Sequence, residues 1–126
     1  MGKPYFADYK IRDLRFHKPS DNPFYNTAAG KYRAIYALGF RNPYTGAIDP
    51  DTGRVFVNDV GFNDYEEINE LEAGKNYGWP ITEGPIRPAE DRPENYKDPI
   101  FSYFHAEGYC PITGGIFYRS TTVSIS

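Results

Sequence analysis

The sequence predicts an all-β protein whose short strands are joined by many turns. The chain contains 12 Tyr and 9 Phe, together with 12 Gly and 11 Pro. Aromatic side chains suit the pleated surface of a sheet, whereas Gly and Pro favour turns. In addition, short apolar runs recur at intervals and are bounded by turn residues, as expected for a β-sandwich or for propeller blades.

The first two expected strands lie in the N-terminal third of the chain. Residues Tyr9–Phe16 predict a short strand, which a loop rich in Pro and Asn follows. Residues Tyr32–Phe40 form a second apolar run and predict a second strand. Pro43 ends this run, because it biases the residue before it toward extended backbone. Arg41 and Asn42 are therefore expected at a strand end or in a loop.

A β-hairpin is the clearest local prediction. Residues Gly46–Asp49 and Arg54–Asp59 flank the turn Pro50–Gly53. Acidic residues at alternate positions of this turn also suggest a calcium loop of the EF-hand type. That alternative is rejected, because Arg54 stands where the loop needs Gly and Val60 stands where it needs a bidentate Glu.

Three further segments complete the expected organisation. Glu66–Leu71 is too short for a stable helix before the Gly-rich turn that follows, so it is predicted as a strand. Residues 80–99 hold five prolines without any periodicity and are expected to form a long surface loop. Gly114–Tyr118 is predicted to begin another strand.

Composition excludes several classes of protein. The formal net charge is −3 and no segment is strongly basic, which argues against a nucleic-acid surface. No stretch of 18 apolar residues predicts a membrane span, and the first 20 residues lack the apolar centre of a signal peptide. Cys110 is the single cysteine, so it is either a buried free thiol or pairs outside this chain.

An ordered series of motifs resembles the glucose/sorbosone dehydrogenase family. The series consists of Leu38–Pro43, Asp49–Arg54, Asn58–Gly61, Glu66–Asn69 and Asn76–Pro80. Ser20–Tyr25 upstream and Gly108–Gly115 downstream are similar to neighbouring family segments. The match covers about residues 8 to 119 with little insertion.

The resemblance implies a fold and a function. The family consists of six-bladed β-propellers, so residues 1–126 are expected to be a partial propeller domain of two to three four-stranded antiparallel blades, with residues 80–99 as a loop within it. Family members bind pyrroloquinoline quinone (PQQ) and calcium, oxidise aldoses to lactones and pass electrons to an external acceptor. They work in the periplasm or outside the cell. The 126-residue chain alone is expected to be inactive, since it lacks most of the propeller.

Two residues match the cofactor site of the family. The arginine that corresponds to Arg41 faces the quinone, and a guanidinium suits an acidic quinone that carries three carboxylates. Asn42 is expected to help hold the rim of the cofactor. The alternative for Arg41 is a surface salt bridge at a strand end.

Four residues match calcium ligands of the family. The resemblance implies that Gly61 and its neighbour Phe62 bind the cofactor's calcium through backbone carbonyls. Glu67 and Tyr77 match a second, structural calcium position, through a carboxylate and a carbonyl respectively. The alternatives are that Gly61 is an ordinary turn glycine and that Glu67 is a solvated surface acid.

No catalytic base is assigned in this chain. Neither His17 nor His105 matches the family's catalytic histidine, and Asp59 is expected to cap backbone groups. Trp79 is expected to pack in a core. Two alternative functions remain open: a non-catalytic calcium-binding propeller that recognises carbohydrate or protein, and an inactive truncated product. The sequence does not specify the sugar, the electron acceptor or the oligomeric state.

Overall fold

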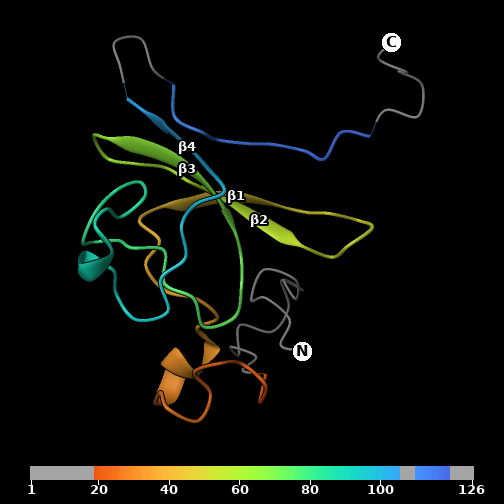
Figure 1. Cartoon of the computed structure of the whole chain (residues 1–126). Coiled ribbons are helices and arrows are strands. Elements are labelled where there is room, and N and C mark those ends of the chain that lie inside the picture. Colours follow the sequence, from red (N-terminus) through yellow and green to blue (C-terminus); the bar gives the residue numbers. More distant parts are fainter. Residues whose placement is uncertain (1–18, 106–109, 120–126) are drawn as a thin grey trace.

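The computed structural model describes residues 19–105 and 110–119, which form a four-stranded antiparallel sheet and two short 3-10 helices (Figure 1). The elements are the helix η2 (Gly30–Ala34), the strands β1 (Pro43–Ile48), β2 (Val55–Asp59) and β3 (Tyr65–Glu70), the helix η3 (Ala89–Asp91) and the strand β4 (Phe101–Phe104). The strands pair in sequence order, β1-β2-β3-β4. The all-β class and the four-stranded antiparallel sheet are thus confirmed.

The β1-β2 hairpin forms as predicted. Ile48 pairs with Val55 at the end of the ladder. The carboxylate of Asp49 then closes the turn, because it accepts hydrogen bonds from the Asp51 N–H at 3.1 Å and from the Thr52 hydroxyl at 2.6 Å. A short polar side chain that binds its own turn in this way makes a tight connection between two strands.

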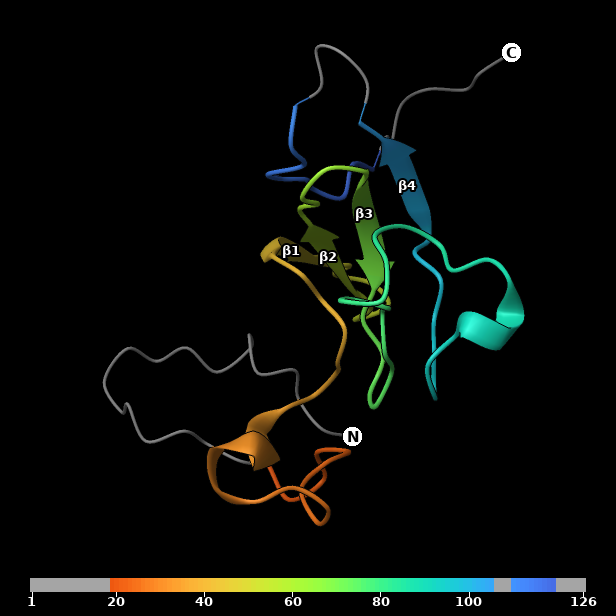
Figure 2. The same ribbon diagram turned by 90° about the vertical axis from the view of Figure 1, so that its left-hand side faces the viewer.

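The strand predicted over Glu66–Leu71 is also confirmed, as β3, with a shift of one residue. The strand β4 was not predicted. Its aromatic run Phe101–Phe104 pairs with β3, and Tyr103 lies opposite Glu66. Residues 71–100 connect β3 to β4 and contain η3 as their only regular element among the described residues (Figure 2).

Two strand predictions are wrong. Within Tyr32–Phe40 the first residues belong to η2, because the N–H of Ile35 donates to the carbonyl of Tyr32 rather than to a neighbouring strand. Leu38 makes only an isolated parallel bridge with Asn76. Gly114–Tyr118 has no ladder partner among the described residues and is not a strand. The strand predicted over residues 9–16 lies outside the described residues.

Residues 110–119, named here the C-terminal strap, run back across the sheet (Figure 1). The strap begins where the Tyr103 hydroxyl of β4 donates to the carbonyl of Cys110, at 3.0 Å. The ring of Phe117 then contacts the ring of Phe56 in β2 edge-on, and Arg119 forms ion pairs with the carboxylates of the β1-β2 turn. Side-chain contacts on the face of the sheet thus replace the expected ladder. Cys110 is exposed, so the buried-thiol alternative is wrong.

The interior of the described residues is unusually polar. Its buried apolar residues are Ala34, Val57, Tyr77 and Ile86, whereas its buried polar residues are Asn22, Asp49, Asn58, Asp59, Glu66, Glu67 and Asn69. Buried acids are costly unless hydrogen bonds or charges compensate them. Five of the seven buried polar residues lie on β2 and β3, so that part of the sheet is a candidate functional site. In the part of the chain that the structure describes, no helix is long and apolar enough to span a bilayer.

Candidate functional site

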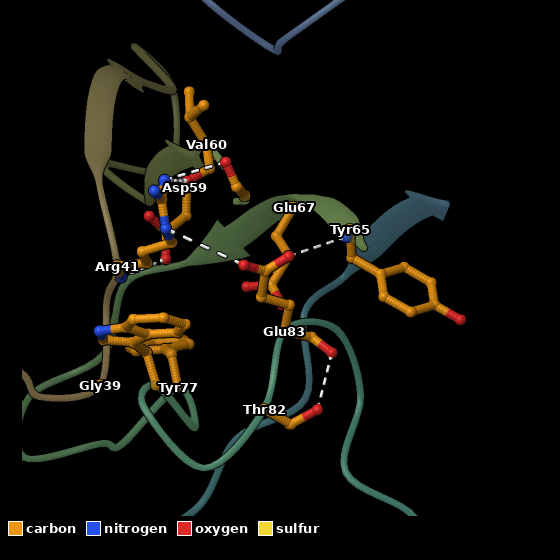
Figure 3. A pocket seen from close by; sticks show the side chains of 11 residues that line it. Gly39, Arg41, Asp59, Val60, Tyr65, Glu67, Tyr77, Thr82 and Glu83 are labelled. Atoms are coloured by element: carbon orange, nitrogen blue, oxygen red, sulfur yellow. Dashed lines mark hydrogen bonds and ion pairs between the residues drawn. The ribbon is translucent and has the colours of Figure 1, made fainter. Parts of the chain in front are cut away.

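A pocket lies where β2 ends and β3 begins (Figure 3). It brings together four of the six predicted site residues, namely Arg41, Gly61, Glu67 and Tyr77, and adds Asp59 and Glu83. These residues come from the segment before β1, from the two ends of the β2-β3 connection and from the long β3-β4 connection. Three carboxylates and one guanidinium line the pocket, so it has an excess of acidic groups.

Arg41 is held at several points by the β2-β3 connection. Its Nη1 donates to the carbonyl oxygens of Val60 and Gly61, each at 2.9 Å. The guanidinium carbon lies 5.0 Å from the centroid of the Phe62 ring and 5.7 Å from that of Trp79. Arg41 therefore lines the pocket at the end of β2 and lies 3.9 Å from a carboxylate oxygen of Glu83, a contact that the strand-end ion-pair alternative also predicts. Its role toward the cofactor stays a prediction. Trp79 is 37% exposed beside the single sheet of the described structure, so its expected packing between blades stays a prediction.

Gly61 occupies a position that admits no side chain. A Cβ atom added there would lie 1.9 Å from the carbonyl oxygen of Tyr65, far inside van der Waals contact. The close approach of the two ends of this connection therefore requires glycine. It leaves the Gly61 carbonyl directed at the guanidinium of Arg41.

Asp59 and Glu67 are directly opposite each other on β2 and β3, and both are buried. Burial raises the pKa of Asp59, although the N–H groups of Arg41 and Asn42 donate to its carboxylate at 2.9 and 2.6 Å and oppose this rise. Burial likewise raises the pKa of Glu67, against hydrogen bonds from Asn69 and Gly84. The prediction that Asp59 caps backbone groups is confirmed, and Glu67 is not a solvated surface acid.

Tyr77 packs in the core beside the pocket, with its ring stacked on that of Phe40 at 4.4 Å between centroids. Its hydroxyl donates to the Glu70 carbonyl at 2.5 Å and accepts from the Glu72 N–H at 2.9 Å. Burial raises the pKa of Tyr77 to about 12, so this hydroxyl stays protonated at neutral pH. Its phenol therefore serves the fold, and only its backbone is available for the predicted ligand role.

Asn42 and Phe62 lie outside the pocket lining. The side chain of Asn42 is exposed, while its backbone carbonyl accepts from the Val60 N–H at 3.0 Å and joins the ends of β1 and β2. Phe62 is 65% exposed and lies beneath the Arg41 guanidinium. Both residues therefore border the position of Arg41.

Glu83 is the main site residue that sequence reasoning missed. Its carboxylate accepts hydrogen bonds from four consecutive backbone N–H groups, those of residues 62–65. It also lies 3.9 Å from the Nε of Arg41. Burial raises the pKa of Glu83, but the four N–H groups together outweigh this and lower the pKa overall. No motif marks such a residue, because its partners are backbone amides.

His105 contacts a second buried acid, away from this pocket. Its Nε2 lies 2.6 Å from an oxygen of Glu66, and the other oxygen of Glu66 accepts from the Ile112 N–H of the strap at 3.0 Å. This arrangement ties β3, the residue after β4 and the strap together. In residues 19–105 and 110–119, no group of three or more His, Cys, Asp or Glu side chains is arranged to hold a metal ion.

Comparisons of the sequence and of the fold with known proteins point to one family. The family model described as Glucose / Sorbosone dehydrogenase matches residues 13–124. The chain is 37% identical over 118 residues to the HIPL2 protein of Arabidopsis thaliana, which covers 82% of this chain and 17% of that protein. It is 42% identical over 66 residues to quinoprotein glucose dehydrogenase B of Acinetobacter calcoaceticus, covering 52% of this chain and 13% of that protein.

Solved structures include similar folds. A structure described as glucose dehydrogenase matches with a TM-score of 0.56 at 30% identity, over 71% of this chain and 27% of that one. The chain thus spans less than a third of each of these relatives.

Proposed function

Because this chain belongs to the glucose/sorbosone dehydrogenase family, we propose that it supplies part of the cofactor site of a PQQ- and calcium-dependent sugar dehydrogenase. The whole protein would oxidise an aldose to a lactone and pass electrons to an external acceptor, in the periplasm or outside the cell. The observation that carries this proposal is the meeting of Arg41 with the carbonyl oxygens of Val60 and Gly61 in one pocket.

The donor groups of the pocket fit calcium. The carbonyl oxygens of Val60 and Gly61 converge on one nitrogen of a positively charged group, so they create a position that favours a cation. Backbone carbonyls are suitable ligands for calcium, a hard ion. The excess of carboxylates over guanidinium adds a favourable potential. In this proposal the Gly61 carbonyl binds the calcium of the cofactor, and the adjacent Phe62 carbonyl is a further ligand.

Arg41 also fits an acidic quinone. Its planar guanidinium presents several donors suited to a carboxylate, and the rings of Phe62 and Trp79 restrict where it lies. When bound, PQQ would supply a hydride acceptor for sugar oxidation, and calcium would supply a Lewis acid. The role of this chain is to hold and orient the cofactor: Arg41 binds its carboxylate, and exposed Asn42 borders its rim.

We propose Glu67 and the Tyr77 backbone for a second cation position. Both line the same pocket, and the raised pKa of Glu67 reflects a buried carboxylate whose neighbouring charges are those of Asp59 and Glu83. A cation beside Glu67 would offset this cost, because an opposite charge favours the ionised carboxylate.

The test is to reconstitute the whole protein that contains this chain with PQQ and calcium, and then to add a panel of aldoses and an artificial electron acceptor. Dye reduction should require PQQ, calcium and sugar together, and Arg41→Ala should abolish most of it. Arg87→Ala, which removes an exposed charge on the β3-β4 connection, is the matched control. A folded protein that binds no PQQ and reduces no dye with any aldose would refute the proposal. The isolated 126-residue chain should be inactive, because catalysis needs the whole cofactor cage in one geometry.

A further inference from the structure

We propose that Glu83 is a positioning residue that fixes the cation-binding carbonyls of the β2-β3 connection. This inference rests on the proposed function, since it concerns the same pocket. Glu83 itself need not touch the cation or the quinone. Its role is to hold the peptide units that carry the carbonyl oxygens of Gly61 and Phe62, since the N–H groups of those units, on Phe62 and Asn63, donate to Glu83.

The hydrogen bonds of Glu83 cover the whole connection after Gly61. One carboxylate oxygen accepts from the Phe62 N–H at 2.6 Å. The other accepts from the N–H groups of Asn63, Asp64 and Tyr65, at 3.1, 2.7 and 3.2 Å. Four consecutive N–H groups directed at one carboxylate form an anion-binding concavity, and here a side chain of the same chain fills it. The 61–65 backbone is thus wrapped around Glu83.

The turn that carries Glu83 is itself anchored to the pocket. The N–H of the next residue, Gly84, donates to the carboxylate of Glu67 at 2.6 Å. A Cβ on Gly84 would lie 2.6 Å from the Tyr65 ring, so glycine allows this turn to approach the connection closely. The side chain of Glu83 is only 9% exposed. The turn therefore holds both the β2-β3 connection and the acid on β3.

Charge explains why the residue must be an acid. Its carboxylate lies 3.9 Å from the Nε of Arg41, whose Nη1 contacts the carbonyls of Val60 and Gly61. The same carboxylate thus sets the position of the loop and of the guanidinium (Figure 3). A carboxylate has acceptor capacity on both oxygens, whereas a glutamine amide presents N–H groups on one side. Glutamine keeps one acceptor oxygen, so even with that oxygen facing residues 63–65 its NH2 group would face the Phe62 N–H, and the negative charge beside Arg41 would be lost.

The experiment compares three variants of the whole protein that contains this chain. Glu83→Gln removes the charge and half of the acceptors, whereas Glu83→Asp keeps the charge but is too short to reach all four amides. Glu90→Gln removes an exposed charge in η3 and is the control. Three readouts are used without PQQ: hydrogen exchange of the amides of residues 62–65, calcium affinity, and the hydration of bound Eu³⁺ from its luminescence lifetime in H₂O and D₂O.

Both Glu83 variants should lose exchange protection at these amides and bind calcium about tenfold more weakly, because charge-assisted hydrogen bonds that fix the ligands are lost. Bound Eu³⁺ should gain coordinated water, which a merely destabilised fold would not cause. Glu90→Gln should match the parent.

Retained protection in Glu83→Gln would overturn the inference, as would lost protection with unchanged affinity and Eu³⁺ hydration. If Glu83→Asp behaves as the parent, the charge alone matters and the positioning role is wrong. A parent that binds neither calcium nor Eu³⁺ would instead refute the calcium site, and with it this role.

Discussion

Glu67 and Glu70 lie on the same strand, β3, yet their pKa values move in opposite directions. Burial raises the pKa of Glu67 in the pocket. Glu70, near the other end of β3, accepts a hydrogen bond from the Arg54 Nε at 2.5 Å and pairs with Lys97 at 3.3 Å, and these partners lower its pKa to about 2. The region around Glu70 is a completed ion-pair network, whereas the pocket contains acids with too few cations. The difference indicates where the molecule would gain from binding a cation.

The largest expected effect comes from removing the one cation of the pocket. Arg41→Ala should weaken PQQ binding by at least about tenfold, since a hydrogen bond to a charged group contributes about 1.5–3 kcal/mol. Without PQQ, the same variant should bind calcium more tightly, because the guanidinium no longer competes for the carbonyls of Val60 and Gly61. Titration calorimetry measures both affinities.

For Arg41→Ala, PQQ affinity should fall while calcium affinity rises, so this one variant tests both proposed roles of the pocket. Arg87→Ala again controls for loss of an exposed positive charge. Parent-like PQQ affinity in Arg41→Ala would remove this residue from the cofactor site. Calcium affinity that falls rather than rises would show that Arg41 supports the carbonyls instead of competing for them.

The next effect concerns Glu67. An acid whose folded pKa is raised destabilises the fold increasingly as the pH rises through its unfolded value, and the penalty is complete above the folded pKa. Glu67→Gln should therefore raise the melting temperature of the calcium-free protein at pH 7, because its oxygen can keep the Gly84 N–H and its NH2 group can donate to the buried, unpartnered Oδ1 of Asn69 once that amide turns over. It should also remove most of the further rise that calcium produces.

Differential scanning calorimetry with calcium and with a chelator separates these two effects. Glu94→Gln, at an exposed position of the β3-β4 connection, is the control for lost negative charge. If Glu67→Gln responds to calcium as the parent does, Glu67 is not a cation ligand.

The smallest effect is expected at Glu70, where the network is complete. Its folded pKa of about 2 lies below the ordinary value of 4.5, so its stabilisation is present above pH 4.5 and is lost as the pH falls toward 2. Glu70→Gln should lower the free energy of unfolding at pH 7 by about 1 kcal/mol, once solvent screening of this partly exposed site is taken into account.

Urea unfolding at several pH values checks this prediction. The difference between Glu70→Gln and the parent should shrink as the pH falls below 4.5, and Glu94→Gln should show no such trend. A difference that is independent of pH would mean that packing, not charge, determines the contribution of Glu70.

The sequence predicted the local parts of this structure and part of the pocket. The β1-β2 hairpin and β3 were predictable because their turn residues and side-chain pattern lie within one short segment. Arg41, Gly61, Glu67 and Tyr77 were recognised by their motifs, and the fold places them around one pocket. Their assigned roles toward PQQ and calcium stay predictions.

The missed features depend on contacts between distant segments. Glu83 binds backbone amides that lie 18 to 21 residues earlier, and such partners leave no mark in side-chain patterns. Strand β4 follows the Pro-rich connection, which concealed its short aromatic run. The Gly114–Tyr118 run has the composition of a strand but lies on the sheet's face, a placement that only tertiary structure determines.

The C-terminal strap has a consequence for the order of events during synthesis. Strand β4 ends at Phe104, so the four-stranded meander can pair once that residue is available. The strap joins residues much farther apart in sequence: Ile112 binds Glu66, 46 residues earlier, and Arg119 binds Asp49, 70 residues earlier. At a synthesis rate of roughly 5–20 residues per second, these contacts become available about 0.4 to 3 seconds after the last strand. During that interval the face of the nascent sheet is open to other chains, and chaperones that bind exposed aromatic residues would have their substrate there.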